Sequence, residues 1–86
     1  MKADHKIVKS QLTLAKGQLE GILRMVEDDR YCIDISTQIL AVQAILKKTN
    51  KFILEAHLDS CVKNTLNQEG QEKLQEIFKI MEKLQE

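Results

Sequence analysis

The feature that most constrains this chain is a run of residues in its middle, spaced alternately four and three apart and uninterrupted by proline. This spacing is a seven-residue repeat sustained over three cycles, and it is typical of a helix that packs along another helix. Such a helix needs a partner, from the same chain or from a second copy, to cover its seam. The seam consists of Ile35, Ile39, Val42, Leu46, Thr49, Ile53 and Ala56.

Two further helices are expected, giving an all-α, single-domain chain over residues 1–86 in which 3% of residues are aromatic. With few large side chains, an aliphatic interface between subunits is the expected source of additional core. The helices should span about 5–28, from 30–32 to 64, and 71–85, with a break at 64–70. The first has the apolar residues Leu12, Ala15, Leu19, Ile22 (or Leu23) and Val26. The third has Leu74, Ile77, Phe78, Met81 and Leu84.

Two glycines, Gly17 and Gly21, lie one turn apart inside the first predicted helix. Each costs about 1 kcal/mol relative to alanine in a helix. They indicate either the close approach of another backbone, protein or DNA, or simple tolerance of glycine. The pattern does not choose between these interpretations.

Charge is unevenly distributed although the formal net charge is zero. Residues 1–24 carry five basic and two acidic side chains, a balance of +3, whereas residues 65–86 have three basic and five acidic ones, a balance of −2. This distribution permits a local basic surface, but charge alone favours ordinary solvated helix faces. The polar start and the lack of a long apolar run predict no signal peptide and no membrane span, so a cytoplasmic location is expected.

Cys32, His57 and Cys61 form a constellation suited to metal binding. At 100° per residue, His57 and Cys61 lie about 20° on either side of the direction of Cys32, so all three share one helix face. Cys32 and His57 are nevertheless about 37 Å apart along the axis. They can meet if two copies of the helix pack antiparallel about a dyad near residues 44–46, which produces two equivalent intersubunit sites.

Two thiolates and one imidazole form a soft, three-coordinate set that favours Cu(I), whereas Zn(II) normally takes a fourth ligand. The alternative is structural: Cys32 would be a small apolar residue of the seam, and His57 an ordinary polar residue. Spacing alone does not decide between these interpretations.

The chain resembles the CsoR/RcnR family of metal-responsive repressors over most of residues 7–86. The resemblance is carried by residues 17–22 (GQLEGI), Arg24-Met25, Tyr31-Cys32, Gln38-Ile39, residues 41–43 (AVQ), His57-Leu58 and Cys61. It implies a three-helix subunit, an antiparallel homodimer and a dimer of dimers. The resemblance also implies a function: the protein would bind operator DNA when metal-free and release that DNA on binding metal, which derepresses efflux or detoxification genes.

The resemblance also implies roles for individual residues. Cys32, His57 and Cys61 would be Cu(I) ligands, with Zn(II) or Ni(II) as alternatives. Tyr31 and Glu76 would be linked to the allosteric response. DNA would contact Lys16, Arg24 and Lys48. An arginine typical of the first helix is Gln11 here, and Lys16 stands where arginine is usual, which leaves DNA affinity open.

Relatives with other inducers fit less well. Nickel/cobalt sensors have histidine at the position of Cys61, and nickel sensors with Cys–His–Cys add an upstream histidine that His5 does not match in position. Persulfide sensors lack the histidine between their cysteines. A thiol-redox or persulfide-responsive repressor using Cys32 and Cys61 is therefore the main alternative. A helical assembly module without a DNA role is a third. No catalytic constellation is present, so an enzyme is not expected.

Overall fold

The computed structural model describes residues 1–62 and 68–85, and the side chains of 61 and 62 are outside this description. Its helices are α1 (His5–Glu27), α2 (Cys32–Val62) and α3 (Gln68–Leu84). This confirms the all-α, three-helix prediction. α3 begins before the predicted position, so Gly70 belongs to the helix and not to a break. The predicted end of α2 at Asn64 lies outside the described residues.

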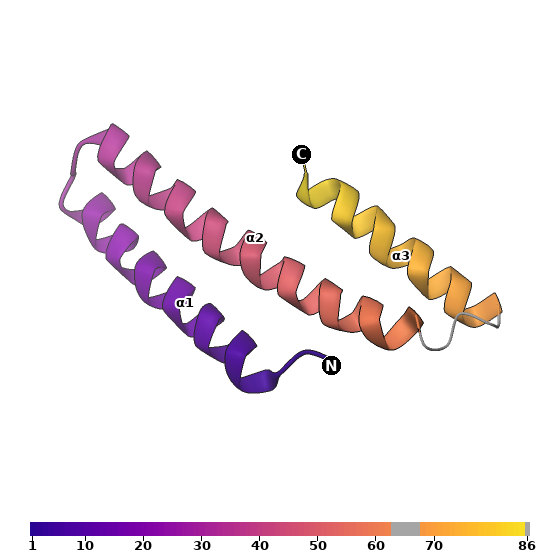
Figure 1. Cartoon of the computed structure of the whole chain (residues 1–86). Coiled ribbons are helices and arrows are strands. Elements are labelled where there is room, and N and C mark those ends of the chain that lie inside the picture. Colours follow the sequence, from indigo (N-terminus) through magenta and orange to yellow (C-terminus); the bar gives the residue numbers. More distant parts are fainter. Residues whose placement is uncertain (63–67, 86) are drawn as a thin grey trace.

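The three helices lie side by side in one layer (Figure 1). α1 and α2 form an antiparallel hairpin, and α3 runs back along the C-terminal half of α2, on the side away from α1. In the described part of the chain, α2 contacts both other helices, which do not contact each other. The Cα positions extend over 56 × 27 × 12 Å. A layer this thin leaves both of its broad faces open.

Local hydrogen bonds define both ends of α1. The Asp4 carboxylate accepts from the backbone N–H groups of Lys6 and Ile7, at 2.8 and 3.3 Å, and so caps the N-terminus. At the C-terminus the N–H of Arg30 donates to the carbonyl of Met25 at 3.0 Å, and Asp29 adopts a φ of 52°. This is a Schellman-type ending, in which a left-handed residue turns the chain out of the helix. α2 can therefore start at Cys32, two residues after Arg30, and run back along α1.

The core between α1 and α2 is built on Ala15, Ile22 and Val42, with Ile35 and Ile45 packed against it. The predicted apolar face of α1 was partly wrong. The buried positions of α1 in this contact, Ala15 and Ile22, are seven residues apart, and the other predicted apolar residues are not buried. These residues, which are exposed in the single chain, are Leu12, Leu19, Leu23 and Val26.

The core between α2 and α3 is a second, separate cluster. Leu54 and Ile77 are buried, and four partly buried side chains pack on them: Leu58, Leu74, Met81 and Leu84. The predicted face of α3 is confirmed at every position except Phe78, which is exposed. Phe78 lies on the side of α3 turned from α2, because one residue rotates a helix by about 100° from Ile77.

The seam residues of α2 have two different surroundings: some are buried against α1 and others are exposed. Val42 and Thr49 are each 3% exposed, on the side of α2 that faces α1. Ile39 and Leu46 are 42% and 43% exposed, and no helix of the layer covers them. The hairpin therefore uses only half of the seven-residue repeat, and the other half is available to a further helix.

Among the described residues, neither internal glycine of α1 lies close to the backbone of another element. A Cβ at Gly17 would meet nothing within 4 Å, and one at Gly21 would lie 3.8 Å from the guanidinium of Arg24. Close approach within the subunit is thus not the reason for either glycine.

Candidate metal centre and nucleic-acid interface

Cys32 and His57 lie on the open face of α2. Cys32 is the first residue of the helix and is exposed, and His57 is half-buried near the other end. From Cys32, helical rotation places Ile39, Leu46 and His57 within about 40° of one direction. Two predicted ligands and the uncovered half of the seam therefore share one face. The backbone of Cys61 belongs to the same helix, but its side chain lies outside the described part of the chain.

The two described ligand candidates are not brought together within one subunit. α2 is continuous between them, so they are separated by about 37 Å along its axis. Among the described residues, no three side chains of His, Cys, Asp or Glu are grouped so as to hold a metal ion. A site that uses both Cys32 and His57 must draw on two chains.

A cavity of about 250 Å³ joins His57 to α3. Its lining includes Glu76, so the structure places a predicted allosteric residue near a predicted metal ligand. Ile53 and Ile80 supply apolar walls, and the cavity is also bordered by Lys2. A carboxylate near an imidazole can accept its N–H and fix which ring nitrogen carries the proton.

Sequence reasoning missed Met1 and Lys2, which line the same cavity, and Ala3, which is buried beside it in the chain. These residues precede α1, where helical periodicity carries no information. The chain offers no spacing signal that would have identified them.

Tyr31 is exposed and lies immediately before α2. Its carbonyl accepts the N–H groups of Asp34 and Ile35, at 3.0 and 3.2 Å, and so begins the helix. Within one subunit it lies beside Cys32, at the end of α2 opposite His57. The structure therefore does not bring Tyr31 and Glu76 together in the single chain.

The predicted DNA contacts are all exposed: Lys16 and Arg24 on α1, and Lys48 on α2. In the described residues the ion pairs are Lys51–Glu55 at 3.9 Å and Lys73–Glu69 at 3.5 Å. The three predicted contacts are thus free of carboxylate partners there, and their charge is available to an external anion.

Comparison with known proteins defines the class. Residues 4–83 match the family model described as metal-sensitive transcriptional repressor. The chain belongs to this family, whose members regulate transcription and are not enzymes. No helix in the described ranges is long and apolar enough to cross a membrane.

Among individual proteins, the chain is similar to the copper-sensing transcriptional repressor CsoR of Bacillus subtilis, with 38% identity over 88% of this chain and 76% of the relative. The corresponding Mycobacterium tuberculosis protein is 36% identical over 88% of this chain. The chain spans 65% of the length of that relative.

Two solved structures share the fold. The Cu(I)-containing copper-sensing repressor CsoR of Geobacillus thermodenitrificans aligns with a TM-score of 0.79 and 34% identity, covering 94% of this chain and 85% of that one. The nickel-responsive regulator InrS aligns with a TM-score of 0.78 over 98% of this chain and 96% of that one. Its 20% identity supports the fold alone.

Proposed function

We propose that this chain is a cytoplasmic, copper-responsive repressor. It binds operator DNA when metal-free and leaves the DNA when Cu(I) binds between subunits, which derepresses genes for copper efflux or detoxification. The observation that carries the proposal is the open face of α2, where Cys32 and His57 flank the exposed Ile39 and Leu46. The names of the relatives, which are copper-sensing repressors, support the choice of metal.

The proposed assembly is an antiparallel pairing of two α2 helices. The uncovered seam residues would meet their counterparts at the centre, which places Cys32 of one subunit beside His57 and Cys61 of the other. Two such dimers would form the tetramer.

The donor set fits the ion. Thiolates are soft ligands that select Cu(I), and an imidazole completes a three-coordinate set. Bound Cu(I) would supply a linkage between two subunits. The chain's own contribution would be to orient His57. Glu76, which lines the same cavity, would do this by accepting an imidazole N–H.

The DNA surface would consist of Lys16, Arg24 and Lys48, acting on phosphates as exposed cations. Release then requires that Cu(I) and DNA favour different arrangements of the subunits, so that each ligand lowers affinity for the other by the same factor.

The first test is a Cu(I) titration of the reduced, anaerobic protein against a competing chelator. We expect tight binding near one ion per subunit, weakened at least tenfold by Cys32→Ala, His57→Ala and Cys61→Ala. His5→Ala is the matched control and should bind as the parent does. Parallel titrations with Zn(II) and Ni(II) test the alternative metals.

Binding that is indifferent to His57→Ala would contradict the copper site. If the His57→Ala variant still released DNA on exposure to persulfide or oxidant, the thiol-redox repressor would replace the copper-responsive repressor as the proposed function. DNA binding is tested separately, with duplexes that the metal-free protein selects from a random pool. Failure to select any sequence would contradict the repressor role.

A further inference from the structure

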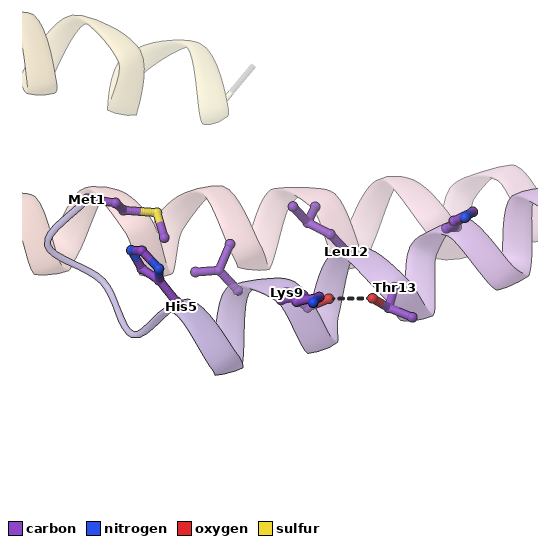
Figure 2. A pocket seen from close by; sticks show the side chains of 7 residues that line it. Met1, His5, Lys9, Leu12 and Thr13 are labelled. Atoms are coloured by element: carbon purple, nitrogen blue, oxygen red, sulfur yellow. Dashed lines mark hydrogen bonds between the residues drawn. The ribbon is translucent and has the colours of Figure 1, made fainter.

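A hollow of about 420 Å³ lies on the N-terminal half of α1. Figure 2 shows the side chains that line it, which project from successive turns of α1, with Met1 beside His5 at one end. Its polar lining consists of His5, Lys9, Thr13 and Lys16. Only Lys16 among these belongs to the DNA surface described above.

The basic side chains of this hollow point in one direction. At 100° per residue, His5, Lys9 and Lys16 fall within an arc of about 40°. Lys9 and Lys16 are seven residues apart, or about 10.5 Å along the axis. The Thr13 hydroxyl donates to the carbonyl of Lys9 at 2.7 Å, so its proton is already used within the helix. The two lysine ammonium groups and the ring N–H of His5 are therefore the donors that this surface offers to an anion.

No carboxylate neutralises these lysines in the described part of the chain, where both recorded ion pairs lie on α2 and α3. The first turn of α1 has no acidic residue, and the first one after it is Glu20. Lysines on α2 and α3 include ion-paired ones, whereas neither Lys9 nor Lys16 forms an ion pair in the described residues. A surface of this kind favours a polyanion as its partner.

Lys9 is exposed on α1 and shares its face with Lys16. We propose that Lys9, together with Lys16, is a phosphate contact for the backbone of duplex DNA. The proposal rests on the DNA-binding function proposed above.

The dimensions suit duplex DNA. A duplex carries one negative charge per about 1.7 Å of axis when both strands are counted, so a 10.5 Å length of it, equal to the rise between the two lysines, carries about six phosphate charges. Contacts of this kind position the protein but do not read bases. Lys9 should therefore affect selected and random sequences alike.

The test measures affinity for a 30-base-pair duplex of random sequence between 50 and 200 mM salt, by fluorescence anisotropy, with the full chain. Each lost phosphate contact lowers the magnitude of the log–log slope by about 0.9. We expect Lys9→Gln to lower it by about 0.9 for every protomer on the duplex, and Lys9→Arg to leave it unchanged. Lys79→Gln is the matched control, because it removes an exposed lysine from α3.

The outcomes separate the two proposals. If the parent binds no duplex at any salt concentration, the DNA-binding function fails. If the parent binds and Lys16→Gln lowers the slope but Lys9→Gln does not, the assignment of Lys9 is overturned while the function stands. Binding to vesicles of 70% phosphatidylcholine and 30% phosphatidylserine that depends on Lys9, without an effect on DNA, would assign the surface to a membrane and also overturn it.

Discussion

At Gly17, helix stability and DNA binding are expected to favour different residues. This glycine lies in the interior of α1, next to Lys16, and it is exposed. A glycine there costs about 1 kcal/mol relative to alanine, and none of the residues that the structure describes occupies the space of the missing Cβ. If a backbone needs that space, it belongs to DNA or to another subunit.

Gly17→Ala should therefore raise the stability of the protein by about 1 kcal/mol per subunit, seen as a higher urea midpoint at fixed protein concentration. The same variant should weaken binding to the selected duplex, because an added methyl group keeps the phosphate backbone from α1. Gly21→Ala is the comparison, since its Cβ would meet the Arg24 side chain at 3.8 Å. Unchanged DNA affinity in Gly17→Ala would indicate that this glycine is merely tolerated.

At the scale of elements, one apolar cluster joins α3 to α2 in the part of the chain that the structure describes. Leu54 and Ile77 are its buried members, and α3 makes no contact with α1 in the described residues. The hairpin has its own cluster around Ala15 and Val42. The two clusters share α2 but have no buried residue in common, so α3 can loosen while the hairpin stays intact.

Ile77→Ala tests this division. Removing a buried isoleucine side chain to alanine costs about 2–5 kcal/mol. We expect faster amide hydrogen exchange across α3, with protection of α1 and the first half of α2 retained. Ile22→Ala, in the other cluster, should speed exchange in the hairpin. Equal acceleration throughout the chain by Ile77→Ala would show that the subunit opens as one unit.

The elements themselves were predictable because nothing in the chain opposes helix and the apolar spacing is regular. The sequence did not predict which of these apolar side chains are buried, because periodicity identifies the apolar side of a helix but does not distinguish between neighbouring positions on it. Leu12 and Ala15 both fit the pattern, and closest approach of two helices selects the smaller. The shared direction of Cys32 and His57 was predictable from the helical rotation of 100° per residue. The cavity that joins His57 to Glu76 was not, because it depends on how α3 packs on α2.

At the scale of the whole molecule, the layer is only 12 Å thick between Cα positions, so a broad face stays uncovered. On that face the α2 residues Ile39 and Leu46 lie between Cys32 and His57 in sequence and within about 40° of the same direction. A face that is apolar in the centre, with ligands toward its ends, needs a second copy both to bury the centre and to complete the ligand set. Assembly and metal binding should therefore be lost together.

Leu46→Glu places a charge at the centre of this face and should convert the assembly to subunits of 9.9 kDa in sedimentation equilibrium, with Cu(I) binding lost. Ala41→Glu is the matched control. It is exposed and lies about 140° around α2 from Leu46, so it should change neither assembly nor Cu(I) affinity. Because a subunit without its partner can unfold, the melting temperature of the parent supplies an independent measure and should rise with protomer concentration. A concentration-independent melting temperature, or a Leu46→Glu variant that keeps its size and its tight Cu(I) binding, would refute the antiparallel α2 interface.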